Sequence, residues 1–336
     1  PMTRIYTFVN QKGGVGKTTS AINIAAYMGH YGQRVLLVDL DPQANATSSL
    51  GIDQRMFKDN IYQVLIGTAP IAPQILHNPR FHISLLPSSP ELAGAEVELL
   101  EMEHRESRLR DALQSIKDRY DYILIDCPPS LSILTLNGLL AAQDGVLIPL
   151  QCEFLALVGL GQLTQTIHRV RNSLYPGLKI RGVFLTMFDG RTRLAQDVVS
   201  EVRGHFPNQV FHSVIPRSIK LAEAPSHGKP TTRRKSWRRA NMACWRARSW
   251  HRTGCRSPNQ SNHPQRGPEA AMSRKGGLGR GLDSLIPGGE PQAQGDTTLF
   301  VPIQKIIPNP RQPRQNFKQD FLMELAESIR QHGVLQ

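Results

Sequence analysis

The chain has 336 residues, and its 40 lysines and arginines outnumber its 27 aspartates and glutamates to give a formal net charge of +13. No apolar run approaches the ~20 residues that a membrane-spanning helix needs, and the apolar segment 4–9 is too short for the core of a signal peptide. The four cysteines show no Cys-x-x-Cys spacing, which argues against a disulfide scaffold. We therefore expect a cytoplasmic protein of about two domains, with its natural start at Met2 and no contact with a membrane.

The positive charge is concentrated in one segment of the chain. Residues 1–230 carry 22 basic and 20 acidic side chains, whereas residues 231–271 carry 10 basic side chains and one acidic side chain. All three tryptophans also lie in residues 231–271. The net charge therefore does not describe the whole chain, and the composition predicts separate pieces at 2–230, 231–271, 272–298 and 299–336.

Short apolar runs alternate with helical patterns through residues 2–230. The runs lie at 4–9, 35–38, 122–125, 145–150 and 180–185. Helical patterns separate them, among others at 21–28, 91–117 and 155–174. Runs that are apolar on both faces are typical of parallel strands covered by helices. The pattern predicts a doubly wound α/β domain with a mostly parallel sheet.

The chain after residue 230 shows a different organisation. Residues 231–271 follow neither the helical nor the strand period, and residues 272–298 are glycine-rich and expected to be flexible. A strand-like run at 301–307 comes next, and a helix follows whose apolar face is formed by Phe321, Leu322, Leu325 and Ile329. This last piece is too short to bury a core of its own, so we expect it to be the truncated start of a second domain.

A glycine-rich loop at 12–19, Lys-Gly-Gly-Val-Gly-Lys-Thr-Thr, joins the first predicted strand to the first predicted helix. Glycines let backbone N–H groups approach a polyphosphate, and a helix N-terminus adds partial positive charge. In this setting Lys17 is placed to neutralise the β- and γ-phosphates, and the Thr18 hydroxyl is placed to bind Mg²⁺. The loop predicts a polyphosphate ligand with Mg²⁺, and the candidate residues of this cofactor site are Asn10, Gly13, Gly14, Val15, Gly16, Lys17, Thr18 and Thr19.

The loop departs from the common Gly-x-x-x-x-Gly-Lys-[Ser/Thr] pattern. Gln11 occupies the position of the first glycine, and an additional lysine, Lys12, precedes the double glycine. Because Lys17 already serves the loop's own nucleotide, we expect Lys12 to reach the phosphates of a second copy, as an arginine finger does in other NTPases. Gly13 and Gly14 would then let the two backbones come close together.

Aspartates stand where two predicted strands end. Asp126 fits a Mg²⁺ ligand that acts through water, and Asp41 is placed to hold the attacking water and to respond to Mg²⁺. Asp39 is the weaker candidate, for which we expect a capping or supporting role. The residues thus predict catalytic roles for Lys12, Lys17 and Asp41, and a metal site of Thr18, Asp41 and Asp126.

Three segments resemble the signatures of the ParA (Soj-type) partition ATPases, which are P-loop proteins with a deviant Walker motif. They are Asn-Gln-Lys-Gly-Gly-Val-Gly-Lys-Thr-Thr at 10–19, Leu-Val-Asp-Leu-Asp-Pro-Gln-Ala-Asn at 37–45 and Ile-Asp-Cys-Pro-Pro-Ser at 125–130. The segments 185–192 and 214–230 resemble further ParA blocks. The resemblance therefore covers residues 3–230.

This resemblance implies a function and additional site residues. It implies a homodimer that forms with ATP, in which Lys12 acts across the interface, and it places Met187 and Pro216 on either side of the adenine. It also implies that the dimer binds DNA non-specifically through Arg191, Arg217 and Lys220, and so associates with the nucleoid. Without the resemblance, these three basic side chains would be interpreted as solvated surface charges.

Two other families share this loop type. A MinD-type division-site ATPase ends in a membrane-binding amphipathic helix, and no such helix is visible in this sequence. A nitrogenase-type iron protein needs cysteines placed to bridge a cluster, and Cys127 and Cys152 show no such pattern. The ParA interpretation is therefore favoured.

A second resemblance begins near residue 272. The segment 273–286 resembles the extreme N-terminus of a ParB-type partner, and 301–336 resembles the opening of the ParB nucleotide-binding domain. In that family the basic N-terminal peptide docks on ParA and stimulates hydrolysis, which singles out Arg280. A glycine-rich basic linker is the alternative. The later ParB motifs are missing, so no CTP hydrolysis or specific DNA-site binding is assigned.

The segment 231–271 fits neither family. A ParA relative would continue into a C-terminal helix, whereas this chain reads Thr-Thr-Arg-Arg-Lys-Ser-Trp-Arg-Arg from residue 231. One interpretation is an Arg/Trp arm that grips DNA. The other is a shift of reading frame between neighbouring ParA and ParB genes, which the abrupt change of composition favours. We therefore expect either a partition ATPase or an ATPase-dead chimera that presents the peptide around Arg280 to a separate ParA.

Overall fold

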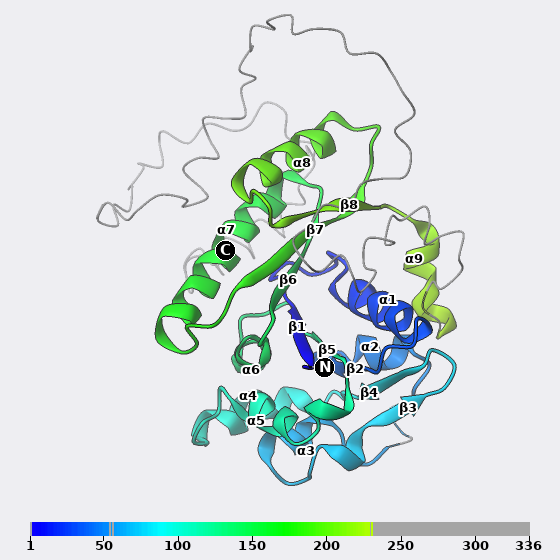
Figure 1. The fold of residues 1–336 in the computed structure, drawn as a ribbon, viewed down its shortest axis with the longest axis vertical. Coiled ribbons are helices and arrows are strands. Elements are labelled where there is room, and N and C mark those ends of the chain that lie inside the picture. Colours follow the sequence, from blue (N-terminus) through cyan, green and yellow to red (C-terminus); the bar gives the residue numbers. More distant parts are fainter. Residues whose placement is uncertain (1, 54, 56, 229, 231–336) are drawn as a thin grey trace, which may run out of the picture. The chain divides into compact units, whose positions relative to one another are not determined.

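The computed structural model describes residues 2–53, 55, 57–228 and 230. These residues form an eight-stranded sheet in the order β3-β4-β2-β5-β1-β6-β7-β8 (Figure 1). Neighbouring strands pair in parallel, except β3 and β4, which are antiparallel. The predicted doubly wound, mostly parallel sheet is therefore confirmed. The predictions for residues 231–336, including Arg280, lie outside the described residues.

The elements have the following bounds. The strands are β1 (Arg4–Phe8), β2 (Val35–Asp39), β3 (Leu76–Asn78), β4 (Ile83–Leu86), β5 (Tyr122–Asp126), β6 (Gly145–Gln151), β7 (Ile180–Phe188) and β8 (Val210–Pro216). The α-helices are α1 (Lys17–His30), α2 (Asn45–Ser49), α3 (Ile61–Ile66), α4 (Leu92–Glu98), α5 (Arg108–Gln114), α6 (Ile133–Ala141), α7 (Phe154–Ser173), α8 (Arg193–His205) and α9 (Ile219–Glu223).

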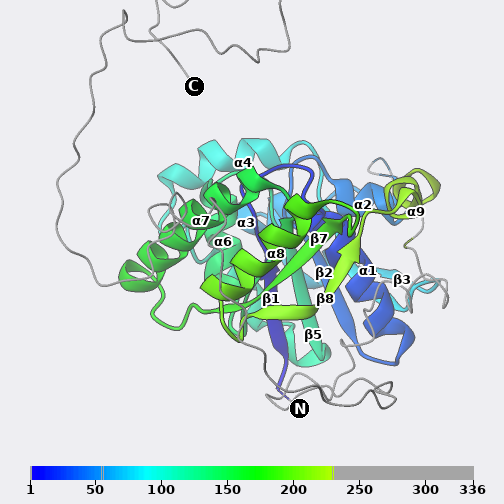
Figure 2. The same cartoon turned by 90° about the horizontal axis from the view of Figure 1, so that it is seen from above.

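Helices cover both faces of the sheet. Alternate residues of a strand point to opposite faces, and in β1 the side chains of Tyr6 and Phe8 belong to the core beneath α1 while Ile5 belongs to the opposite core. The helices α3 to α6 cover β2 and β5 on that opposite face, and α7 and α8 cover β6 and β7. Figure 2 shows the same layers from above. Continuous burial of β2, β5 and β6 explains why their sequences are apolar runs.

The helix expected at 91–117 is broken, and that part of the prediction is wrong. The structure forms α4, a 3₁₀ turn (Leu99–Glu101) and then α5. Asn137 of α6 explains the second start, because its side chain accepts a hydrogen bond from Leu109 N at 3.0 Å and donates one to Arg105 O at 2.8 Å. A side chain from another helix thus satisfies backbone groups that a continuous helix would pair internally.

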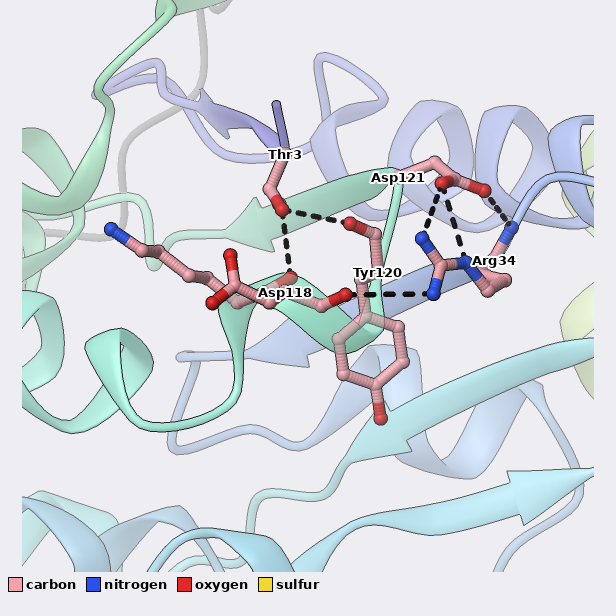
Figure 3. A network of polar contacts seen from close by, with 6 residues as sticks. Thr3, Arg34, Asp118, Tyr120 and Asp121 are labelled. Carbon is pink, nitrogen blue, oxygen red and sulfur yellow. Dashed lines mark hydrogen bonds and ion pairs between the residues drawn. The ribbon is translucent and has the colours of Figure 1, made fainter. Parts of the chain in front are cut away.

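Polar contacts tie together the amino ends of β1, β2 and β5 (Figure 3). The Thr3 hydroxyl donates to Lys117 O at 2.7 Å and contacts Tyr120 O at 2.8 Å. Arg34 donates to Asp121 from its backbone N–H at 2.8 Å and from its guanidinium Nη2 at 2.8 Å. This network, called the amino edge below, fixes the strands at the side of the sheet opposite their carboxyl ends.

Candidate functional site

The carboxyl ends of β1, β5 and β2 lie side by side. Phe8 pairs with Asp126, and Asp126 pairs with Asp39 on the other side. The glycine-rich loop follows β1 directly, and Asp41 lies two residues beyond the end of β2. The parallel register therefore brings the loop and three aspartates to one edge of the sheet, called the carboxyl edge below.

The loop has the backbone of a phosphate cradle. Gly14 and Gly16 have φ values of 71° and 89°, in the left-handed region that favours glycine. A Cβ placed on Gly13 would meet no atom within 4 Å. The loop is open on this side, so its backbone is accessible to another molecule.

Two buried side chains hold the loop in place. The Asn10 carboxamide accepts a hydrogen bond from Lys12 N at 3.0 Å and donates one to Pro149 O at 2.7 Å. The Thr186 hydroxyl, at the end of β7, donates to Val15 O at 2.8 Å. Asn10 was predicted to bind the cofactor, and in the structure it anchors the loop to β6. Thr186 was missed, because no local pattern links it to the loop.

Lys17 lies inside the loop and is 6% exposed. Its Nζ donates to Lys12 O at 3.3 Å. Burial lowers the pKa of Lys17, while the charges of Asp126 and Asp41 act in the opposite direction. The structure thus brings Lys17 close to both predicted acidic residues.

Asp126 is fully buried, and neither carboxylate oxygen has a hydrogen-bond partner among the described residues. Burial raises its pKa well above the ordinary value, the charge of Asp39 adds to this, and the Thr18 hydroxyl and Lys17 oppose it. A buried carboxylate without a partner is costly unless a cation or donor satisfies it. Asp126 and its neighbour Thr18 therefore fit the Mg²⁺ site predicted for them.

Asp39 and Asp41 have different surroundings. Asp39 Oδ2 accepts hydrogen bonds from Thr47 N at 2.8 Å and Thr47 Oγ1 at 2.7 Å, so it supports the first turn of α2. Burial raises the pKa of Asp39 from 3.8 to about 6. Asp41 is 5% exposed, and its Oδ1 accepts from Gln43 N at 3.0 Å. The contacts of Asp39 agree with the supporting role expected for it.

Lys12 forms a contact that was not predicted. Its Nζ lies 3.0 Å from Glu153 Oε2, and Gln151 Nε2 donates to Glu153 Oε1 at 2.5 Å. Arg217 Nη2 is 3.9 Å from the same Oε1. Glu153 lies two residues beyond the end of β6, as Asp41 does beyond β2, so the rule that selected Asp126 and Asp41 at strand ends would also have selected it.

Met187 and Pro216 lie on neighbouring strands at the same edge. Pro216 ends β8 and pairs with Phe188 of β7, next to Met187. Met187 has a φ of 52°, an unfavourable backbone conformation for this side chain. Strain of this kind is concentrated at functional sites. Both residues thus lie at the carboxyl edge, and that they flank an adenine stays a prediction.

The three predicted DNA-binding residues lie at the ends of β7 and β8. Arg191 pairs with Asp189 at 2.6 Å and its side chain is 89% exposed. Arg217 follows β8 and pairs weakly with Glu153. Lys220 lies exposed in α9. Arg191 and Arg217 therefore each have a carboxylate neighbour.

Two features are absent from the residues that the structure describes. No group of three or more histidine, cysteine, aspartate or glutamate side chains in this part of the chain has the arrangement of a metal site. None of the described helices is both long and apolar enough to cross a membrane.

Comparisons with known proteins identify the family. A family model described as an AAA domain matches residues 3–180. The chromosome partitioning protein ParA of Myxococcus xanthus is 54% identical over 228 residues, which are 68% of this chain and 80% of that protein. The chain belongs to the ParA/Soj family. The sporulation initiation inhibitor protein Soj of Bacillus subtilis is 48% identical to this ParA-family chain over 68% of the chain and 90% of Soj.

Solved structures agree with this family. The cobyrinic acid a,c-diamide synthase of Mycobacterium smegmatis with bound ADP and magnesium is 41% identical, with a TM-score of 0.62, over 68% of this chain and 93% of the synthase. A putative plasmid partition protein of Borrelia burgdorferi bound to AMPPNP is 26% identical, with a TM-score of 0.61, over 71% of this chain and 95% of the Borrelia protein. A second family model, described as a ParB N-terminal domain, matches residues 289–336. The predicted order of a ParA-like part followed by a ParB-like start is confirmed, and the boundaries at 230, 271 and 298 stay predictions.

Proposed function

We propose that this chain is a Mg²⁺-dependent partition ATPase that dimerises with ATP, binds DNA non-specifically as a dimer and hydrolyses ATP faster when a ParB-type partner binds. The observation that carries the proposal is the unpartnered Asp126 carboxylate beside Thr18 and the glycine-rich loop. The solved relatives that hold ADP with magnesium or AMPPNP support it.

Each residue of the carboxyl edge has a chemical task in this proposal. Backbone N–H groups of the loop and the Lys17 ammonium bind the phosphates. Thr18, Asp41 and Asp126 would hold Mg²⁺, which neutralises phosphate charge when bound. Asp41 positions the attacking water, and Met187 and Pro216 flank the adenine. Lys12 acts on the partner subunit's phosphates in the dimer.

Hydrolysis by the full chain tests the enzymatic part. We expect Mg²⁺-dependent ATP hydrolysis that duplex DNA stimulates, and a fall to background in Lys17→Ala. Lys58→Ala is the matched control, because Lys58 is an exposed lysine outside the loop. Activity in Lys17→Ala equal to that of the control would contradict the proposal.

Binding of DNA is tested separately. We expect the AMPPNP-bound chain to bind duplex DNA of any sequence, with an affinity that falls steeply as salt rises. Arg217→Ala and Lys220→Ala should weaken this binding. Arg80→Ala is a control at the other end of the sheet, between β3 and β4. Equal losses in all three variants would remove the assignment of these residues.

The match of residues 289–336 to the ParB N-terminal domain favours a second candidate function. In this candidate the chain hydrolyses no ATP and presents the peptide around Arg280 to a separate ParA. Background hydrolysis by the full chain, together with stimulation of a separate ParA that is lost in Arg280→Ala, would support it. Sequencing of the coding DNA tests the proposed frame shift, since one intact frame through codons 231–271 would contradict it.

A further inference from the structure

Glu153 occupies an unusual place at the carboxyl edge. It is the N-cap residue of α7, where a side-chain oxygen commonly accepts a hydrogen bond from the first turn of the helix. The Glu153 side chain makes no such bond. It turns instead toward the glycine-rich loop and contacts Lys12, Gln151 and Arg217. The carboxylate is thus used for contacts between segments and not for its own helix.

The two lysines of the loop are held differently. Lys17 is buried and points back to the loop backbone, where its Nζ donates to Lys12 O. The Lys12 side chain is 36% exposed and leaves the loop to reach Glu153, whose side chain is 45% exposed. Since Gln151 donates to the other carboxylate oxygen, the carboxylate is held in the orientation that meets Lys12.

We infer that Glu153 is a positioning residue that holds Lys12 on its own subunit until Lys12 binds the nucleotide of a second copy. The inference rests on the proposed function, because it requires Lys12 to act across a dimer interface. In a single chain the ion pair keeps the Lys12 ammonium next to Glu153 of the same subunit. When the dimer forms, Lys12 leaves the Glu153 carboxylate and binds the phosphate oxygens of the second copy's nucleotide.

The environment of the pair suits a contact that opens. Both side chains are partly solvated, and exposed ion pairs change an equilibrium constant by about fivefold at most. When Lys12 leaves, Glu153 keeps Gln151 and the Arg217 guanidinium as neighbours. Its charge is therefore not left without a partner, which lowers the free energy needed for release.

The test uses the full chain and the variant Glu153→Gln, which keeps the shape of the side chain and removes its charge. Asp189→Asn is the matched control, because it changes the net charge equally and frees Arg191, not Lys12. Two measurements are made, namely acylation of Lys12 in the nucleotide-free chain by mass spectrometry, and AMPPNP-dependent dimerisation by sedimentation. Urea unfolding of both variants checks the fold.

We expect Glu153→Gln to acylate several-fold faster at Lys12 than the wild type, with Lys220 as the internal reference and no change in Asp189→Asn. Each dimer opens two such contacts, so the dimer dissociation constant should fall by up to about 25-fold. Unchanged acylation, an unchanged dissociation constant, or a weaker dimer would each overturn the inference. Absence of an AMPPNP-dependent dimer in the wild type would contradict the proposed function, whereas the acylation result still tests the contact itself.

Discussion

The two edges of the central strands differ in how their polar groups are satisfied. At the amino edge, Thr3 and Arg34 make close hydrogen bonds to their neighbours, and Asp121 has several donors. At the carboxyl edge, the Asp126 carboxylate has no hydrogen-bond partner among the described residues, and Lys17 is buried. The same strands therefore carry a satisfied end and an unsatisfied end, and the latter is the one that a ligand completes.

The difference teaches how the fold supports the site. Unpartnered charges and unfavourable backbone conformations destabilise a protein and persist only where the surroundings enforce them. The amino edge provides part of this support, because its hydrogen bonds fix the amino ends of β1, β2 and β5, whose other ends form the carboxyl edge.

Asp126→Asn should give the largest effect. The variant loses the predicted Mg²⁺ ligand, and ATP hydrolysis should fall by about 10- to 100-fold. Its free energy of unfolding without Mg²⁺ should not decrease, because burial disfavours the Asp126 charge more than Thr18 and Lys17 favour it, and the substitution removes that charge. ATPase assays and urea unfolding in the presence of a chelator measure both. A variant that is both inactive and less stable would show that Asp126 is structural.

Asp39→Asn should change the pH dependence of stability. Burial raises the pKa of Asp39 from 3.8 to about 6, so the folded chain binds this proton more tightly than the unfolded chain. Its stabilising contribution is complete below about pH 4 and is lost as the pH rises through about 6, a change of about 2–3 kcal/mol that the variant should lack. Urea unfolding between these pH values measures it.

Asp121→Asn should remove a pH dependence of stability that is opposite in sign to that of Asp39. The hydrogen bonds from Arg34 lower the pKa of Asp121, so its contribution to stability is present above its unfolded pKa and is lost as the pH falls. The two aspartates should therefore have opposite slopes. Slopes of the same sign would contradict the distinction between the edges.

Gly13→Ala should weaken dimerisation without changing the fold of the single chain. The added methyl group meets no protein atom within 4 Å, so the fold of the single chain should be unchanged. If two loops approach each other in the dimer, two methyl groups enter that interface, and dimerisation should weaken about tenfold or more. Gly29→Ala is the opposite control, because its Cβ would lie 2.5 Å from His82 O and would destabilise the fold itself. Undiminished dimerisation would place Gly13 outside the interface.

Thr3→Val should have the smallest effect. It removes the hydroxyl that contacts two carbonyl groups at the amino edge, and the free energy of unfolding should fall by about 1 kcal/mol. ATP hydrolysis should be unaltered, because the network lies at the opposite end of the strands. A loss of activity larger than the loss of stability would mean that the two edges are coupled.

The sequence predicted those features of the fold and the site that a single short segment encodes. The buried strands are continuous apolar runs, and the loop with Lys12 and Lys17 can be recognised within a few residues. The strand ends also predicted that Asp39, Asp41 and Asp126 would share one edge. Strands β3, β4 and β8 were not predicted. Strands β3 and β4 have only three and four residues, and β3 and β8 are only partly buried, so none of the three forms a long apolar run.

Features that depend on contacts between distant segments were missed. The break before α5 depends on Asn137, which lies 28 residues after Leu109. The Glu153 contact with Lys12 spans 141 residues. Neither follows from local propensity or periodicity, because the partner is chosen by the packing of other elements.

The hydrogen bond from Thr186 to Val15 O has a consequence for how the protein is made. It joins residues that are 171 positions apart, so the glycine-rich loop is synthesised long before the strand that completes its conformation. Domains that emerge from the ribosome fold as units. A nascent chain that ends before β7 would therefore carry the loop sequence without its final support, and nucleotide capture during translation should begin only after β7 has left the exit tunnel.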